Sequence, residues 1–157
     1  MRGIVSMIKR LNLNDINTVK DLLELQVASY IKEAEIIGFY DIPPLKDTVD
    51  SLKESKEIFY GYYVDNVLAG MISYKIYNHI LDIHRVAVHP EFFRKGIAQK
   101  LIEYVENVDS NVKKIIVCTG KGNIPAEKLY LKNGYIKTGH IKVNEEVYLT
   151  SFEKIKQ

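Results

Sequence analysis

The spacing of apolar residues predicts that the chain opens with a strand followed by a helix. Residues 6–11 (SMIKRL) alternate weakly between polar and apolar positions, which is typical of a strand. Asn14 or Asp15 can cap the helix that follows. The apolar residues of that helix recur at helical spacing, at Ile16, Val19, Leu22, Leu23 and Val27.

Two prolines interrupt the next segment. Residues 30–37 either continue the first helix or form a second one. Pro43 and Pro44 end any helix there, because proline lacks the amide hydrogen and clashes with the preceding turn. Residues 47–56 suit another short helix. We therefore expect an N-terminal helical layer before the main run of strands.

Residues 58–88 have the pattern of three consecutive antiparallel strands. Residues 58–64 (IFYGYYV) are rich in the aromatic and β-branched residues that favour strands. A turn at Asp65-Asn66 leads into a longer strand over 67–77, and a turn at Asn78-His79 leads into a third strand over 80–88. The segment therefore predicts a β-meander.

Beyond residue 90 the apolar period changes from two to 3.6. A strand over 113–119, a helix over 126–133 that ends at Gly134, and a hairpin over 135–143 and 147–155 complete the chain. The helix before them carries one apolar stripe, formed by Ile97, Ala98, Leu101, Ile102, Val105 and Val108. This order predicts an α+β fold, with a mixed, mostly antiparallel sheet and helices on both faces.

Composition favours one globular domain over residues 1–157. Hydrophobic residues make up 46% of the chain and charged residues 27%, which excludes a disordered or collagen-like class. No apolar run approaches the roughly 18 residues of a membrane span, and the N-terminus lacks the apolar stretch of a signal peptide. The net charge of +2 is too balanced to indicate nucleic-acid binding. The single cysteine, Cys118, rules out an internal disulfide, so we expect a cytoplasmic protein with neither membrane nor nucleic-acid partners.

The segment from Val86 to Leu101 (VAVHPEFFRKGIAQKL) has the chemistry of an anion site. A strand ends, a polar loop follows, and a helix opens within residues 94–98, where unpaired backbone N–H groups and the helix dipole favour negative charge. Gly96 and Ala98 let an anion approach the backbone closely, and Arg94 adds positive charge. The alternative is an ordinary loop whose small residues let the helix pack on the sheet.

The segment from Gly122 to Tyr135 (GNIPAEKLYLKNGY) is the second one of interest. Asn123 or Ile124 can cap the helix that follows, and Ala126 and Tyr130 lie four residues apart on one helix face. Taken alone, Asn123 is explained by capping and Tyr130 by a place in the core.

Together, the two segments resemble the motifs of the GNAT superfamily of N-acetyltransferases. The first is similar to the family's V-x-V-x-P followed by [QR]-x-x-G-x-[GA], and the second to N-x-x-A-x-x-x-Y-x-x-x-G-[FY]. The meander before them and the hairpin after them also match the family order. Two positions depart from the pattern: Phe93 stands where the family usually has Gln or Arg, and Arg94 stands where Gly is common. No phosphate contact is therefore expected from the Phe93 side chain, and the adjacent Arg94 can compensate.

The resemblance implies that acetyl-CoA binds where the strands over 80–88 and 113–119 splay apart. The backbone of Val86 and Val88 would pair with the pantetheine arm, the Val86 N–H would contact the oxyanion, and Asn123 would lie near the thioester. The full set of expected cofactor-binding residues is Val86, Ala87, Val88, Phe93, Arg94, Lys95, Gly96, Ile97, Ala98, Gln99, Asn123, Ala126 and Tyr130. We expect no metal ion.

The same resemblance implies direct attack of a primary amine on the thioester, with Tyr130 as general acid toward the departing thiolate. Asp82 or His84 would be the base; on a regular strand both face the same way as Val86, and His84 has the more convenient ordinary pKa, ~6.5 against ~3.9. The alternative is that both only line the mouth of the cleft. Cys118 is expected to be a small core residue.

The acceptor amine stays open at this point. A small amine and a protein N-terminus or lysine both suit the reaction, and the N-terminal helical region and terminal hairpin would recognise them. A different class of function, a non-catalytic CoA-binding sensor or partner module on the same fold, is the alternative to an enzyme. The last strand of such sheets can pair with another subunit, so a homodimer is one option for the assembly.

Overall fold

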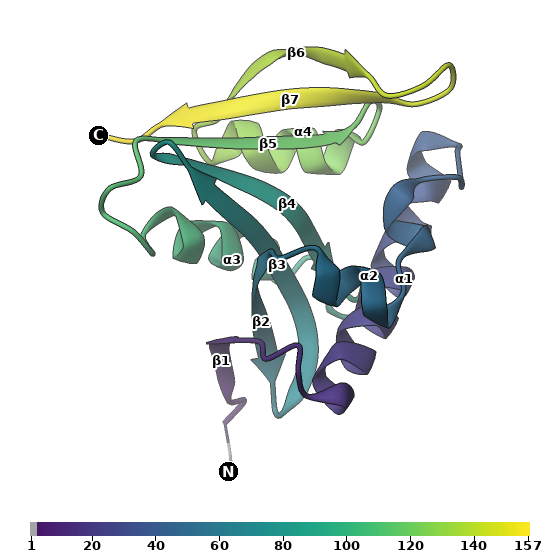
Figure 1. Cartoon of the computed structure of the whole chain (residues 1–157), viewed down its shortest axis with the longest axis vertical. Helices are drawn as coiled ribbons and strands as arrows, with labels where there is room; N and C mark the ends of the chain where they lie inside the picture. The colour runs from purple at the N-terminus through teal and green to yellow at the C-terminus, as the bar shows by residue number, and fades with distance from the viewer. Residues whose placement is uncertain (1–2) are drawn as a thin grey trace.

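The computed structural model describes residues 3–157 as one open sheet with helices on both sides (Figure 1). The sheet has seven strands in the order β1-β2-β3-β4-β5-β7-β6, and β4 and β5 are parallel while the other neighbours are antiparallel. The strands are β1 (Ser6–Arg10), β2 (Ile58–Val64), β3 (Val67–Tyr77), β4 (Ile80–Val88), β5 (Lys114–Gly120), β6 (Ile136–Lys142) and β7 (Tyr148–Ile155). The mixed, mostly antiparallel sheet predicted from the sequence is confirmed.

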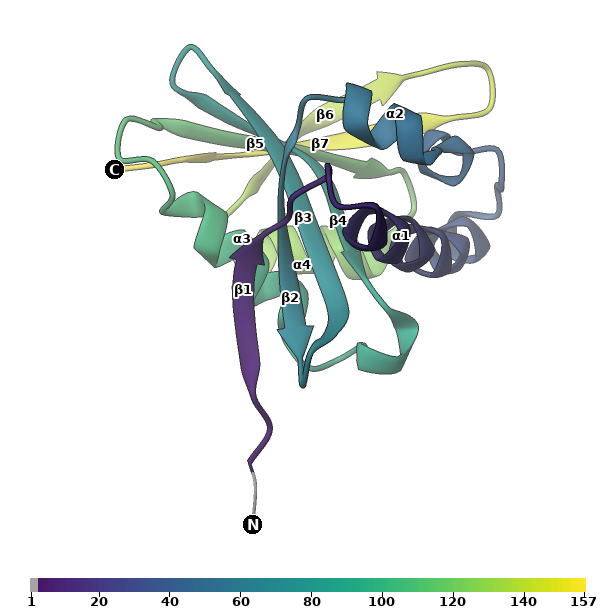
Figure 2. The same cartoon turned by 60° about the horizontal axis from the view of Figure 1, so that its bottom comes forward.

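The helices cover opposite faces of the sheet and enclose two separate cores (Figure 2). On one face lie α1 (Ile16–Ile37) and α2 (Val49–Glu54), packed against the sheet through residues such as Phe59 and Met71. On the other lie α3 (Ile97–Glu106) and α4 (Ile124–Lys132), over a larger core that includes Ile72 and Phe152. Within residues 3–157, no helix is both long enough and apolar enough to cross a bilayer.

Residues 30–37 continue the first helix and do not form a second one, so that α1 is a single long helix. The Asp15 side chain accepts a hydrogen bond from the Asn17 N–H and so caps its start. The helix runs without a break to Ile37 and ends at Gly38, whose φ of 75° lies in the left-handed region that favours glycine. The prolines at 43 and 44 therefore follow the end of the helix rather than causing it, and they begin a short 3-10 turn, Pro43–Lys46. As a result, α1 extends far enough to reach the end of β5.

A β-bulge in β4 contradicts the regular strand expected over residues 80–88. Tyr74 pairs with Ile83 and Ser73 with Arg85, so His84 is the extra residue. The bulge reverses the alternation of side chains along the strand. Asp82 therefore lies on the sheet face opposite to Val86, and the expectation that the two side chains share a face is wrong.

The central parallel pair is short, and this opens the sheet. β4 and β5 are paired from Ile80–Lys114 to Ile83–Val117 and no further. Beyond that point β4 bends away through its bulge, while β5 continues along β7 as far as Gly120. Figure 1 shows the two halves of the sheet diverging there, with the C-terminal part of α1 beside the gap.

Candidate functional site

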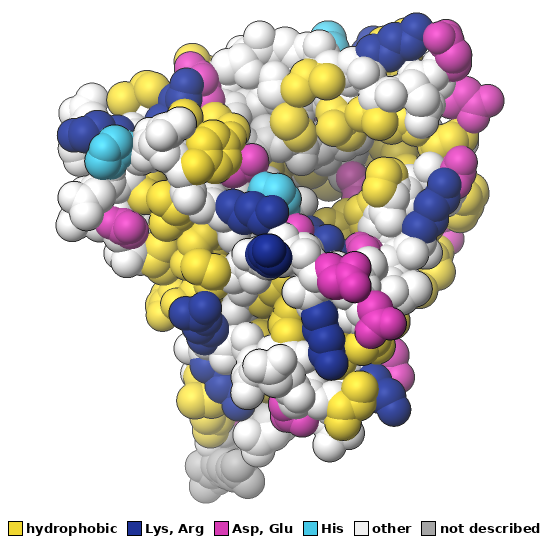
Figure 3. All heavy atoms as spheres, viewed as in Figure 1, with side chains coloured by type: hydrophobic (Ala, Val, Ile, Leu, Met, Phe, Trp, Pro, Cys, Tyr) yellow, Lys and Arg dark blue, Asp and Glu magenta, His cyan; other side chains and the backbone are white. Residues whose placement is uncertain are grey.

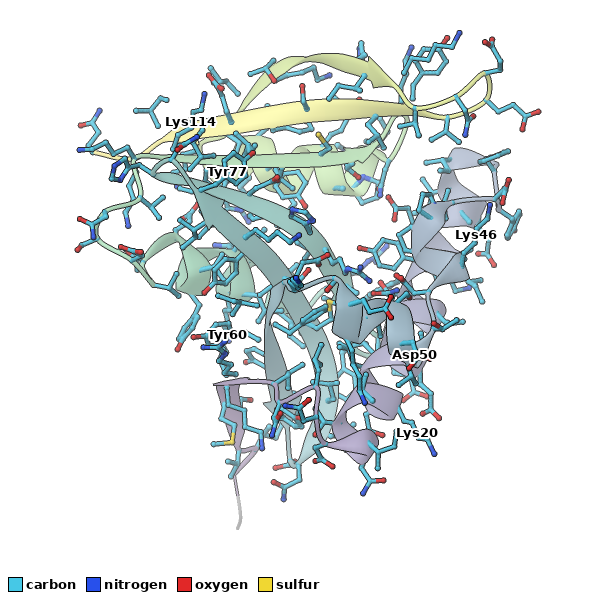
Figure 4. All side chains as sticks on the ribbon, in the orientation of Figure 1. Lys20, Lys46, Asp50, Tyr60, Tyr77 and Lys114 are labelled. Carbon is cyan, nitrogen blue, oxygen red and sulfur yellow. The ribbon has the colours of Figure 1, made fainter. Side chains whose placement is uncertain are left out.

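A cleft of about 910 Å³ lies where β4 and β5 diverge. Its walls come from α1, β4, the loop before α3, β5 and α4, so segments far apart in the sequence meet there. Figure 3 shows the surface hollowed between the β7 half of the sheet, at the top, and α1, at the right. The closed end of the β4–β5 pair, where Figure 4 labels Tyr77 and Lys114, lies away from α1.

Most residues expected to bind the cofactor line this cleft. Ala87 does not: it is buried in the core beneath α1, because the bulge turns its side chain to that face. Lys95 is exposed outside the cleft wall. The expected residues that do line it are Val86, Val88, Phe93, Arg94, Gly96, Ile97, Ala98, Gln99, Asn123, Ala126 and Tyr130.

The start of α3 forms one end of the cleft. The helix begins at Ile97, inside the range 94–98 suggested by the sequence, and Gly96 is its cap with a φ of 74°. Arg94 also has a positive φ, 63°, so the chain turns sharply just before the helix. The first amide bonded within the helix region is that of Lys100, to the Gly96 oxygen at 3.1 Å. The preceding N–H groups are therefore free of intrahelical bonds and can bind an anion.

Hydroxyl groups of α1 occupy the edge of β4 that β5 leaves open. The Ser29 hydroxyl accepts a hydrogen bond from the Val88 N–H at 3.3 Å, and the Tyr30 hydroxyl donates to the Val86 oxygen at 3.4 Å. Both distances are long for hydrogen bonds of these types. This backbone edge is therefore polar and only weakly satisfied, as a strand-like ligand that pairs with it would require.

Tyr130 lies on α4 in the middle of the cleft. Its ring packs against Tyr135 and Phe152, at centroid distances of 5.7 and 5.5 Å. Burial, followed by the proximity of Glu33 and Cys118, raises the pKa of the Tyr130 phenol well above its ordinary value. The phenol therefore keeps its proton at neutral pH and can act as a hydrogen-bond donor.

A carboxylate that the sequence analysis did not single out, that of Glu33, lies beside Tyr130 and Asn123. Asn123 caps α4 by accepting from the Ala126 N–H at 3.3 Å, and its amide nitrogen donates to Glu33 Oε1 at 3.1 Å. The Thr119 hydroxyl is 3.4 Å from the same oxygen. Burial raises the pKa of Glu33, although these hydrogen bonds and one from the Gly120 backbone oppose the shift. The only sequence signal was a charged residue next to the apolar face of α1, which many surface helices share.

His84 is held between two carboxylates rather than free in the cleft. Its Nε2 lies 3.3 Å from Asp82 and its Nδ1 3.5 Å from Glu57. Hydrogen bonds to Asp82 and then Glu57 raise the pKa of the imidazole to about 9. At neutral pH the ring is therefore protonated, and a proton-accepting role for His84 requires a higher pH than its ordinary pKa suggested. Whether Asp82 or His84 takes part in catalysis stays a prediction.

The raised pKa of His84 makes stability depend on pH in a defined direction. The protonated ring stabilises the fold fully below the unfolded pKa of ~6.5, and this contribution is lost as pH rises through about 9. The ring is partly exposed, so solvent screening reduces the effect to about 1 kcal/mol. Urea unfolding at pH 6 and pH 9.5 should show this loss in the wild type and not in His84→Gln. An equal loss in both proteins would contradict it.

Arg85 neutralises the buried acids behind His84. Its Nε donates to Glu57 Oε1 at 2.9 Å, and its Nη1 donates to Asp47 and, at 3.0 Å, to Gln26 Oε1. Burial alone would raise the pKa of Glu57, but hydrogen bonds from His84, Ser73 and Arg85 outweigh it and lower that pKa to about 2. The cluster joins α1, the segment before α2, β3 and β4, and so fixes one wall of the cleft.

Cys118 is exposed, which contradicts the core position expected for it. Its neighbours Val117 and Thr119 are buried, so β5 does alternate. The face that carries Cys118 looks onto the cleft, because β4 has already turned away. Partial desolvation against the cleft wall, followed by the charge of Asp82, raises the pKa of the thiol, so it is not an activated thiolate.

Comparisons with known proteins agree on one family. The acetyltransferase (GNAT) family matches residues 19–135. The chain is 38% identical over 146 residues to UPF0157 protein YqkA of Bacillus subtilis (strain 168), covering 93% of this chain and 43% of that protein. It therefore spans less than half the length of that curated relative.

Solved structures share the fold at low sequence identity. The PaiA N-acetyltransferase of Thermoplasma acidophilum, in complex with coenzyme A, superposes with a TM-score of 0.78 at 19% identity, over 97% of this chain and 99% of that one. The ribosomal-protein-S18-alanine N-acetyltransferase of Escherichia coli gives 0.73 at 11% identity, over 96% and 94%.

Proposed function

This chain belongs to the acetyltransferase (GNAT) family, and we propose that it transfers the acetyl group of acetyl-CoA to a primary amine. The observation that carries the proposal is the meeting of both motif segments in one cleft at the β4–β5 opening. The free N–H groups at the start of α3 suit a pyrophosphate, and the open edge of β4 suits an extended amide-bearing arm. The coenzyme A complex of the Thermoplasma protein supports the choice of cofactor.

The proposed reaction is direct transfer within a ternary complex. The amine nitrogen, after losing a proton, attacks the thioester carbonyl, and a C–N bond forms. The carbon–sulfur bond then breaks, and the thiolate receives a hydrogen bond from the Tyr130 hydroxyl. The amide nitrogen loses its second proton as the CoA sulfur gains one, so the products are an N-acetyl amine and free CoA. Asn123, fixed by its capping bond, would hold the arm near the thioester.

The class of acceptor follows from the chemistry only as far as a primary amine. A small amine and a peptide amine both complete the reaction. The names of the structural relatives support an amine acceptor, since one of them acts on an alanine of a ribosomal protein. The reaction requires acetyl-CoA with either acceptor, so binding of acetyl-CoA is the first property to test.

Calorimetric titration with acetyl-CoA should show saturable one-to-one binding, and Gly96→Ala should weaken it by about tenfold, because a methyl group would stand where the phosphates approach the helix start. Gly38→Ala is the matched control. Both glycines have a φ near 75° and open space where a Cβ would stand, but Gly38 ends α1 outside the cleft. Both changes should cost about 1 kcal/mol of stability through backbone strain, and only the first should affect affinity.

A wild-type protein that binds no acetyl-CoA at millimolar concentration would contradict the proposal. Equal losses of affinity in Gly96→Ala and Gly38→Ala would show that the start of α3 does not hold the cofactor. A free-thiol assay with primary amines then tests transfer itself, and tight binding without turnover would identify a CoA-binding module instead of an enzyme.

A further inference from the structure

Glu33 differs from the other carboxylates in and around the cleft, because most of those have a cationic partner. Glu57 and Asp47 share Arg85, Asp82 pairs with His84, and outside the cleft Glu106 pairs with Lys154. Glu33 has no ion pair with any residue in the described range, 3–157. Glu33 is partly buried. A carboxylate that is removed from water without a counter-charge is costly, because desolvation penalises the charged form.

The Glu33 carboxylate is held in a position from which it can accept a hydrogen bond or a proton from a ligand. The Gly120 backbone helps to hold the carboxylate. The side-chain hydrogen bonds from Asn123 and Thr119 both end on Oε1, so no side-chain donor within residues 3–157 occupies Oε2. Gly120 allows the close approach of α1, since a Cβ there would lie 3.3 Å from Ile37 and 3.6 Å from Glu33 Oε1. A helix side chain is therefore held rigidly in the cleft.

The groups that face Glu33 from the surrounding elements supply no positive charge. Tyr30 on its own helix and Tyr130 on α4 are neutral at pH 7, and burial raises the pKa of each. Arg85 is engaged by Glu57 and Asp47. The cleft also contains two lysines: Lys32, which pairs with Glu35, and Lys132, which is exposed; neither pairs with Glu33.

We propose that Glu33 binds the ammonium group of the acceptor and removes its proton before the attack on acetyl-CoA. The inference rests on the proposed function, because Asn123 and Tyr130 then place the thioester beside the same carboxylate. The ammonium gives one proton to Glu33 and becomes a neutral amine, which forms the C–N bond. Glu33 later releases that proton to water, and the second nitrogen-bound proton replaces the one that Tyr130 provides to sulfur.

The residues around Glu33 also determine which class of acceptor molecule fits, because they contact the part of the acceptor next to its amine. The cleft lining around it is apolar, with Ile36 and Ile37 from α1 and Val147 and Leu149 from the terminal hairpin. A second ammonium on the acceptor would have to lie against these side chains, or near Lys32 at the rim. The acceptor class is therefore a primary amine on an apolar, uncharged body.

Steady-state kinetics of the whole chain at saturating acetyl-CoA test the role of Glu33. The substrates are n-pentylamine, 1,5-diaminopentane and a hexapeptide with a free N-terminal leucine, and the variants are compared on the fastest of them. Glu33→Gln keeps an oxygen for Asn123 but cannot take a proton, and it should lower kcat/KM at pH 7 by ~100-fold. Glu35→Gln, on the same helix and exposed, should stay within twofold of the wild type.

The pH profile separates a proton acceptor from a merely structural residue. Wild-type activity should fall as pH drops through the pKa of Glu33, because the carboxylate must be ionised to accept a proton. In Glu33→Gln this fall in activity at low pH should be absent. The difference in activity between the variant and the wild type should decrease toward pH 10, because more of the amine is then already deprotonated in solution. Acetyl-CoA affinity should change less than threefold in the variant.

Three results would overturn the inference alone: a loss below tenfold in Glu33→Gln, a gap that does not change with pH, or a larger loss in Asp82→Asn than in Glu33→Gln. A kcat/KM for 1,5-diaminopentane equal to or above that for n-pentylamine would contradict the proposed preference for an apolar, uncharged acceptor. A wild-type protein that acetylates none of the three amines would instead overturn the proposed function, and with it the role of Glu33.

Discussion

Replacing Tyr130 by phenylalanine should lower kcat by ~100-fold while leaving the affinity for acetyl-CoA within threefold of the wild type. The substitution removes one oxygen and keeps the ring that packs on Tyr135 and Phe152. Because burial raises the pKa of the phenol, the hydroxyl is fully protonated at neutral pH and gives its hydrogen bond only as negative charge develops on sulfur. Its benefit is therefore confined to the transition state, which is the condition for an effect on kcat rather than on binding.

Tyr135→Phe is the matched control, since it makes the same chemical change one ring away. The Tyr135 hydroxyl donates to Glu106 at 2.7 Å and does not line the cleft. This variant should lose stability, through the lost bond to a carboxylate, and keep its turnover. Unchanged kcat in Tyr130→Phe would remove Tyr130 from the mechanism. A large loss in both variants would indicate that packing, rather than the hydroxyl, controls the rate.

The strands of the meander could be predicted closely because local signals define them. The bounds expected for the strands over 58–64, 67–77 and 80–88 are those of β2, β3 and β4, since short turns at Asp65-Asn66 and Asn78-His79 separate alternating or aromatic runs. Such signals depend on neighbours in the chain. The bulge at His84 depends on register against β3, and the sequence was interpreted as a regular strand. A signal was present: the apolar positions shift phase across His84 and Arg85, from Leu81 and Ile83 to Val86 and Val88.

The site was predictable where its residues lie in contiguous motifs. The segments around Gly96 and around Asn123 meet in the cleft, as expected from their resemblance to the family. Glu33 comes from a helix distant in sequence, and only the tertiary structure places it 3.1 Å from Asn123. Cys118 failed for a related reason. An apolar run such as KIIVCT predicts burial on both faces of a strand, but one face of β5 borders the opening that the bulge in β4 creates.

The same bulge brings Arg85 to the α1 side of the sheet, and replacing Arg85 by methionine should lower the free energy of unfolding by about 3 kcal/mol or more at pH 7. Arg85, Glu57 and Asp47 have side chains only 13%, 6% and 15% exposed. Removing the guanidinium takes away the hydrogen bonds that it donates to the two carboxylates and to the Gln26 oxygen. The cost of burying these groups away from water is then no longer offset. Urea is the suitable denaturant, because guanidinium salt would screen the charges under test.

Two further variants identify the stranded charge as the cause of that loss. Adding Glu57→Gln to Arg85→Met should recover a substantial part of the stability, because a neutral amide costs less to bury than an unpaired carboxylate. Lys114→Met breaks the more exposed pair with Glu153 and should cost less than about 1 kcal/mol. The deficit of Arg85→Met should also shrink as pH falls toward 4, since without the guanidinium Glu57 accepts a proton more readily and becomes neutral. A deficit that is independent of pH and is not reduced by Glu57→Gln would mean that Arg85 stabilises the wall of the cleft by packing its side chain on Phe59, whose ring lies 5.7 Å from the guanidinium carbon.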